Sequence, residues 1–141
     1  MDNAEFLALG RQVLATQPFS VLLGARLEAF QPGRVTLALT LKPEHMQQHG
    51  MAHGGVVSYL ADNALTFAGG SALGVEVITA EFKINYARPA RGSALIARAS
   101  VVATSGRQAV CRCDVWAVQE GGEVLVAAAQ GTIVRRAADS A

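Results

Sequence analysis

A continuous apolar stretch in the middle of the chain constrains the fold more than any other feature. From Val56 to Ala68 nearly every residue is apolar or small, which predicts a helix buried on most sides rather than a surface helix with one wet face. The apolar sides of such a helix need a cover. The segments around it are therefore expected to wrap it.

Four polar side chains interrupt this helix. Ser58, Asp62 and Thr66 recur at a spacing of four residues and form one polar stripe, with Asn63 beside it. A carboxylate here needs a partner or a use, because desolvation opposes its charged form. A structural hydrogen bond or an Arg partner is one interpretation of Asp62. A catalytic role is the interpretation that the neighbouring residues favour.

The start of the same helix has little side-chain bulk. After His53 come Gly54 and Gly55, where a ligand can approach backbone N–H groups that have no partner within the helix. Such a terminus stabilises developing negative charge. A rise of about 1.5 Å per residue separates Gly54 from Asp62 by roughly 12 Å. One carbonyl group cannot contact both the Gly54 N–H and the Asp62 carboxylate of the same chain. If the two act together in catalysis, we therefore expect the site to lie between two antiparallel copies of the helix from different subunits.

The rest of the chain contains strand-like segments with a period of two. Six strands are predicted, over residues 25–31, 34–41, 75–87, 94–104, 108–119 and 123–135. In the third of these, strict alternation places Thr79 and Glu81 on one face and Phe82 on the other. A strand pair, one long helix and four further strands predict an α+β fold, in which a curved antiparallel six-stranded sheet wraps around one long central helix.

The composition fits a single domain over residues 1–141, with an N-terminal helix within 1–18 and a frayed tail over 136–141. The chain is 51% hydrophobic and 16% charged, and this apolar surplus suggests buried subunit interfaces. A net charge of +1, with acids and bases interspersed, argues against nucleic acid as a partner. The start lacks an apolar signal segment, and no apolar run approaches a membrane span, so we expect a soluble, cytoplasmic protein without a membrane partner.

The cysteines and histidines predict no metal site. Cys111 and Cys113 point to the same side of a strand, where a disulfide is sterically poor, and two thiols alone make an incomplete metal site. Buried free thiols are therefore favoured. His45, His49 and His53 recur at spacings of four, but the Pro and Gly residues of this segment argue against the regular backbone that metal ligation needs. We expect these histidines to orient the loop before the helix.

Two motifs in this sequence occur together in a known family. The first is His53-Gly-Gly followed by Leu-Ala-Asp62, and the second is the strand end Asn-Tyr-Ala-Arg-Pro-Ala-Arg-Gly92. With both, residues 19–135 resemble the hotdog-fold thioesterases, most closely the branch named for the phenylacetate-pathway thioesterase (PaaI-like). The resemblance implies a hotdog fold and an acyl-CoA thioesterase, which hydrolyses a thioester to free CoA and a carboxylic acid. CoA is then part of the substrate, and no cofactor is implied.

The resemblance also implies catalytic roles for single residues. Asp62 matches the carboxylate that acts as general base or nucleophile, and Gly54 matches the backbone N–H that polarises the thioester carbonyl from the partner subunit. Gln47 occupies the position of an Asn or Gln that helps to place the thioester or the attacking water. Thr66 matches a water-binding hydroxyl of some relatives, whereas others use a residue near the next strand, which is Ala80 here.

His53 joins this catalytic group because it immediately precedes the glycine pair. Other residues are candidates to bind the substrate. They are Gly55, Ser58 and Asn63 along the helix and, for the CoA phosphates at the surface, Lys83, Arg88, Arg91 and Arg107. Solvated strand-edge charge is the alternative interpretation of the four basic residues.

Two other functions stay open at this stage. One is a hotdog acyl-thioester dehydratase or hydratase, and the other is a non-catalytic acyl-CoA-binding protein. A thioesterase differs from both because it releases free CoA. Since the predicted site lies between subunits, we expect a homodimer at least, and a homotetramer of two such dimers.

Overall fold

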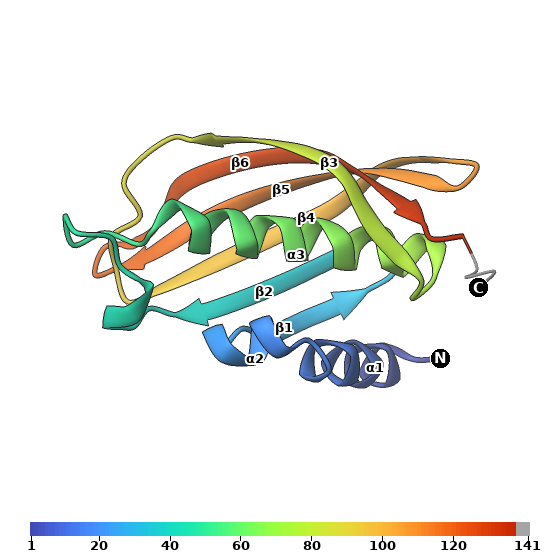
Figure 1. Ribbon diagram of the computed structural model, residues 1–141. Helices are drawn as coiled ribbons and strands as arrows, with labels where there is room; N and C mark the ends of the chain where they lie inside the picture. Colours follow the sequence, from blue (N-terminus) through green and yellow to red (C-terminus); the bar gives the residue numbers. More distant parts are fainter. Residues whose placement is uncertain (138–141) are drawn as a thin grey trace.

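Six antiparallel strands curve around one long helix in the computed structural model of the protein, which describes residues 1–137 (Figure 1). The helices are α1 (Asn3–Ala15), α2 (Pro18–Leu23) and α3 (Gly54–Leu73), with a short 3-10 turn η1 (Pro43–His45). The strands are β1 (Arg26–Gln31), β2 (Arg34–Thr40), β3 (Val77–Tyr86), β4 (Ala94–Ser105), β5 (Gln108–Gln119) and β6 (Gly122–Arg135). Their order across the sheet is β1-β2-β4-β5-β6-β3, with antiparallel pairing at every step. The predicted α+β hotdog architecture is confirmed, and the last part of the expected frayed tail, residues 138–141, lies outside the described residues.

The sheet covers most of the surface of α3. Leu60, Ala61 and Leu65 are completely buried and belong to the one large hydrophobic core of the described chain. Asp62 and Thr66 are only partly buried. One face of the helix therefore stays open, and it is the face that carries the polar stripe.

Helix α3 is longer than the apolar stretch from which it was predicted. It continues through Gly69 and Gly70 to Leu73, although a glycine pair commonly marks the end of a helix. Gly69 serves packing instead, because a Cβ at this position would lie 2.5 Å from the Cβ of Ile133 on β6. The absence of a side chain lets the last turns of the helix approach the sheet closely.

Strand β3 is an edge strand with a bulge, and the expected strict alternation is wrong there. The register with β6 shifts between Thr79 and Glu81, which leaves Ala80 as the extra residue. Thr79 and Phe82 are consequently both partly buried, whereas Glu81 is exposed. Gly131 of β6 makes room for this bulge, because a Cβ on it would lie 2.5 Å from the carbonyl oxygen of Glu81.

The N-terminal helices lie beside β1 at the opposite edge of the sheet (Figure 1). Gly10 lets α1 pack closely on this strand, because a Cβ at this position would lie 2.5 Å from Cδ2 of Phe30. Arg11 Nε also donates a hydrogen bond to the Leu27 carbonyl at 3.0 Å. Pro18 occupies the start of α2, where its missing N–H costs nothing.

The two cysteines lie on β5, and both are buried and free, as predicted. Burial raises the pKa of Cys111 from 9.0 to about 11 and the pKa of Cys113 to about 12. Both thiols therefore stay protonated at neutral pH, and neither is a suitable nucleophile. Within residues 1–137, no helix has both the length and the hydrophobicity that a membrane span requires.

Candidate active site

Hydroxyl groups hold the carboxylate of Asp62. Thr79 Oγ1 donates to Asp62 Oδ1 at 2.7 Å and lies 2.7 Å from Thr66 Oγ1. The Thr66 hydroxyl also donates to the Asp62 backbone carbonyl at 2.8 Å, a bond within one turn of α3. Among residues 1–137, nothing donates a hydrogen bond to Asp62 Oδ2. One carboxylate oxygen is therefore fixed by the protein, and the other is available to a water molecule or substrate.

Asp62 opens into a surface cleft between α3, β3 and the junction of α1 with α2. Residues that line this cleft include Phe19, Tyr59 and Ile78. The ion pairs of the described residues do not include Asp62. The structural interpretation of this carboxylate as the partner of an Arg is thus not realised within residues 1–137.

The start of α3 offers one unused backbone donor. His53 is the N-cap residue, and its Nδ1 accepts a hydrogen bond from the Gly55 N–H at 2.8 Å. The Gly54 N–H donates to no acceptor among residues 1–137. On the other side of Gly54, the Tyr86 hydroxyl donates to its carbonyl oxygen at 3.2 Å. His53 therefore occupies one glycine N–H and leaves the preceding one free.

The loop before α3 is a compact turn that holds Gln47 in place. The Gln47 N–H donates to the Met51 carbonyl at 2.9 Å, and its side-chain oxygen accepts from the His49 N–H. His45 is buried, and its carbonyl accepts from the His53 N–H at 2.9 Å. Two of the three histidines thus organise this loop and the helix start.

A cluster of hydrogen bonds joins α3 to the N-terminal helices beside Asp62. Asn63 Nδ2 donates to Gln17 Oε1 at 3.0 Å, and Tyr59 Oη donates to Ser20 Oγ at 2.6 Å. Ser20 Oγ in turn donates to Gln17 Oε1 at 2.6 Å. The sequence predicted Asn63 as a substrate-binding residue, but its amide hydrogens are engaged in this cluster. It shapes the wall of the site rather than presenting a free donor.

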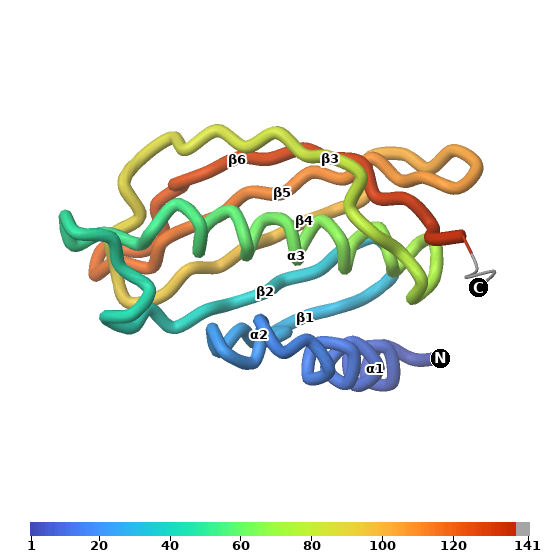
Figure 2. Tube along the Cα trace, in the orientation of Figure 1, coloured from blue at the N-terminus to red at the C-terminus, as the bar shows by residue number. Residues whose placement is uncertain are grey.

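The four basic candidates lie in different places. Arg91 Nη1 lies 3.4 Å from the carbonyl oxygens of His49 and Gly50, and Arg88 Nη1 donates to the Leu125 carbonyl at 2.9 Å. Both therefore lie at the end of the molecule where α3 starts. Figure 2 shows the yellow loop of residues 87–93 beside the green loop before α3 at that end.

Arg107 and Lys83 lie elsewhere. Arg107 lies in the β4–β5 turn at the opposite end of the sheet, where its Nη2 donates to the Arg135 carbonyl at 3.1 Å (Figure 2). The twelve residues of β4 between these ends span roughly 37 Å. Lys83 is exposed on β3. Within one chain, Arg88 and Arg91 are therefore the basic candidates that lie at the end where α3 starts, and Arg107 is not.

The catalytic candidates form two separate groups, one along α3 and one at its start. Asp62 and Thr66 make the first group, and His53, Gly54 and Gln47 make the second, about eight residues of helix away. At about 1.5 Å per residue the two groups are roughly 12 Å apart along the axis. Ser58 lies between them, and its hydroxyl donates to the Gly55 carbonyl at 3.2 Å. A single chain does not bring Asp62 and the Gly54 N–H to one substrate atom.

Thr79 is a site residue that the sequence interpretation missed. Ala80 matches this position by resemblance to the family, but the bulge of β3 turns Thr79 toward Asp62 and leaves Ala80 exposed. One signal was present in the sequence. Gly131 interrupts an otherwise regular strand pattern, and an isolated glycine in a strand indicates a bulge or a close backbone approach.

Comparisons with known proteins agree with this fold. Residues 49–124 match the model of a family described as the thioesterase superfamily. A Deinococcus radiodurans protein with the name "Putative esterase" is 35% identical over 119 residues, which cover 84% of this chain and 79% of that protein.

Solved structures give similar results. A thioesterase family protein from Silicibacter pomeroyi has 34% sequence identity and a TM-score of 0.86, with 94% of this chain and 97% of that chain covered. A mutant of the phenylacetic acid degradation protein PaaI from Thermus thermophilus has 33% identity and a TM-score of 0.75, with 85% of this chain and 100% of that chain covered.

Proposed function

The chain belongs to the thioesterase superfamily and is a hydrolase that acts on thioesters, and we propose that its substrate is an acyl-CoA, which it hydrolyses to free CoA and a carboxylic acid. One observation carries the proposal. Asp62 has one carboxylate oxygen fixed by Thr79 and the other open to a cleft, on a helix whose first residue, Gly54, has an N–H that no acceptor within residues 1–137 occupies. These are the two groups that thioester hydrolysis needs, a positioned base or nucleophile and a donor to the carbonyl oxygen.

We assign the role of general base to Asp62. In this mechanism the open Oδ2 accepts a proton from a water molecule, and the water oxygen forms a bond to the carbonyl carbon of the thioester. The C–S bond then breaks, the carboxylic acid is released, and the proton passes from Asp62 to the CoA thiolate. A direct attack by the carboxylate, which would form an anhydride that water opens, is the alternative for the same residue.

The Gly54 N–H is the proposed donor to the carbonyl oxygen, which becomes negatively charged when the carbonyl is attacked. A preorganised backbone donor of this kind lowers the barrier by about 3 to 4 kcal/mol. The helix N-terminus adds a favourable electrostatic field. His53 supports this role indirectly, because its hydrogen bond to Gly55 fixes the geometry of the first turn. Gln47, in the adjacent turn, is the proposed contact to the thioester or the water.

The two groups act on one substrate only if they come from two chains. We propose a homodimer in which the α3 helices lie antiparallel, so that Asp62 of one chain faces Gly54 and Gln47 of the other. Strand β3 suits such an interface, because it pairs only with β6 among the described strands and carries the exposed apolar residues Ile78 and Tyr86. Two dimers would then form the proposed homotetramer.

The CoA part of the substrate is proposed to lie near the start of α3. A hollow of about 330 Å³ borders Gly54 there, and Tyr86, Arg88 and Pro89 are among the other residues that line it. Arg88 and Arg91 are the proposed partners of the CoA phosphates because they are at this end of the molecule. Arg107 belongs to the same proposal only through a second chain, because it lies at the opposite end of the sheet. Lys83 is exposed on β3, the strand that brings Tyr86 to Gly54.

A panel of acyl-CoA thioesters tests the proposal directly. The purified protein is incubated with each thioester and a thiol reagent, which reports free CoA. Release of CoA by the wild-type protein supports the proposal, and release that depends on Asp62 assigns it to this site. A hydratase or dehydratase would change the acyl group without freeing the thiol, and a binding protein would do neither. No CoA release from any acyl length would contradict the proposed function.

A further inference from the structure

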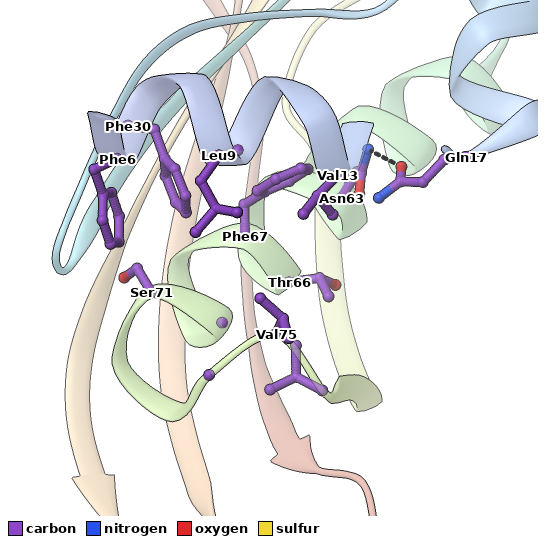
Figure 3. Close-up of a pocket in the computed structure, with 14 residues that line it drawn as sticks. Phe6, Leu9, Val13, Gln17, Phe30, Asn63, Thr66, Phe67, Ser71 and Val75 are labelled. Carbon is purple, nitrogen blue, oxygen red and sulfur yellow. Dashed lines mark hydrogen bonds between the residues drawn. The ribbon is translucent and has the colours of Figure 1, made fainter. Parts of the chain in front are cut away.

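A further hollow lies beside the Asp62 cleft, beneath α1. Its volume is about 260 Å³, and it lies between α1, α3 and the start of β3. Figure 3 shows Leu9 and Val13 of α1 facing Phe67 of α3 across it, with Phe6 and Phe30 at one end. None of the described residues that line it carries a charge. The cavity is therefore suited to an apolar group.

Several polar atoms on the wall of this cavity are already engaged in hydrogen bonds. Ser71 Oγ donates to the Ala68 carbonyl at 2.6 Å and accepts from the Gly33 N–H at 2.8 Å. Asn63 Nδ2 and Gln17 Oε1 bond to each other at 3.0 Å, as Figure 3 shows. A polar or charged ligand group would find few free partners there, and its desolvation would oppose binding.

The cavity and the Asp62 cleft share a wall. Gln17, Asn63, Thr66 and Val77 line both hollows. Thr66 is also within the hydroxyl cluster that holds Asp62, because its Oγ1 lies 2.7 Å from Thr79 Oγ1. The two hollows are therefore adjacent, with these side chains between a carbonyl carbon at Asp62 and the cavity.

We propose that the apolar end of the acyl group occupies this cavity and that Leu9 and Val13 of α1 set the acyl size that the enzyme accepts. This inference rests on the proposed function and adds the substrate class. An apolar cavity of roughly 150 Å³ holds a benzene molecule. The larger volume here fits a medium-length straight chain or one aromatic ring with a short linker. We expect long acyl chains to be disfavoured by size, and acyl groups with a second carboxylate by charge.

The packing of α1 explains why the space stays open. Gly10 and the Arg11 hydrogen bond fix this helix closely on β1. The three phenylalanines at the cavity support one another, since Phe30 packs edge-on against Phe67 at 5.4 Å and lies 4.6 Å from Phe6, measured between ring centroids. These contacts fix the walls and leave the volume between α1 and α3 for a ligand.

The test compares two substitutions on α1, one at a residue that lines the cavity and one at an exposed residue. Val13→Trp fills the cavity, whereas Gln12→Trp adds the same side chain at an exposed position. For Val13→Trp we expect the ratio of kcat/KM for octanoyl-CoA to kcat/KM for acetyl-CoA to fall at least about 10-fold, because each methylene in an apolar pocket is worth a factor of roughly ten or more. Gln12→Trp should keep the wild-type ratio. Wild-type protein should also discriminate against succinyl-CoA, which carries a second carboxylate.

A second variant covers the case that Val13→Trp does not fold. Leu9→Ala enlarges the cavity and should raise the ratio of decanoyl-CoA to hexanoyl-CoA turnover relative to wild type. Octanoate binding, measured by calorimetry, needs no turnover and should be lost in folded Val13→Trp and kept in Gln12→Trp.

These readouts separate the two proposals. If the folded α1 variants release CoA with the same preference for acyl length as the wild-type protein, the cavity is not the acyl site. The proposed thioesterase function would then still stand. Octanoate binding that depends on Val13, without CoA release from any thioester, would support the cavity as an acyl site and overturn the proposed reaction.

Discussion

Thr79 on strand β3 donates a 2.7 Å hydrogen bond to Asp62 on helix α3, although 17 residues separate them in the chain. The β-bulge at Ala80 makes this contact, because it turns Thr79 inward without moving Phe82 off the core. A hydrogen bond from an uncharged donor orients the carboxylate and leaves its charge unneutralised. The catalytic proposal depends on this arrangement, and the first two predictions test it.

Asp62→Asn should retain the fold and lose hydrolysis. The amide has the same size and still accepts a hydrogen bond from Thr79, but it is neither a base nor a nucleophile. We expect turnover to fall at least about 100-fold, measured as CoA release under saturating substrate, with an unchanged thermal unfolding curve. Near-normal turnover in this variant would remove Asp62 from the mechanism.

Thr79→Val removes the hydroxyl and keeps the shape of the side chain. A hydrogen bond to a charged group contributes about 1.5 kcal/mol or more, so kcat should fall about 10-fold, with a smaller change in KM. Thr79→Ser is the matched control and should restore most of the turnover, because it keeps the donor. If Thr79→Val and Thr79→Ser are equally active, the hydroxyl does not position the carboxylate.

Much of this architecture could be predicted from local patterns. The stripe of Ser58, Asp62 and Thr66 follows from helical spacing, and the buried helix follows from its apolar composition. The contact between Thr79 and Asp62 could not be predicted in this way, because a bulge depends on how β3 meets Gly131 of a distant strand. The cavity beneath α1 could not be predicted from a sequence pattern either. Periodicity predicts which face of a helix is apolar, but not how far that face stands from its neighbour.

His53 should act on stability through its cap. His53→Ala removes the acceptor for the Gly55 N–H and should lower the free energy of unfolding by about 1 kcal/mol. His53→Asn supplies a preferred N-cap side chain and should recover most of that loss. Urea unfolding of the three proteins measures both effects. Equal stability of His53→Ala and the wild-type protein would mean that water replaces the hydrogen bond to Gly55 at no cost.

The buried cysteines predict a loss of stability at alkaline pH. An unfolded thiol ionises near pH 9, whereas burial raises the pKa of Cys111 to about 11. Above pH 9 the unfolded chain therefore binds fewer protons than the folded one, and stability falls as the pH rises through this window. Between about pH 8 and pH 10.5, the free energy of unfolding of Cys111→Ala should decline less steeply than that of the wild-type protein. The smaller side chain also changes the free energy of unfolding by a constant amount, which does not affect this comparison of slopes. Parallel declines for the two proteins would contradict the assignment.

Assembly gives the strictest test of the proposed site. Asp62 and Gly54 are roughly 12 Å apart along one helix, so an isolated chain has no complete site. Asp62→Asn disables the base, and Gly54→Val should crowd the N–H that polarises the carbonyl. The backbone at Gly54 has room for a β-carbon, because a Cβ there meets Tyr86 at an ordinary 3.6 Å.

Refolding the two inactive chains together should therefore restore activity. In a heterodimer, one of the two sites combines Asp62 from the Gly54→Val chain with Gly54 from the Asp62→Asn chain. Random pairing makes half of the dimers heterodimers, so about a quarter of all sites should recover. Differently tagged chains allow the heterodimer to be isolated, in which half of the sites should be active. An isolated heterodimer as inactive as either parent would place the whole site within one subunit and contradict the proposed geometry.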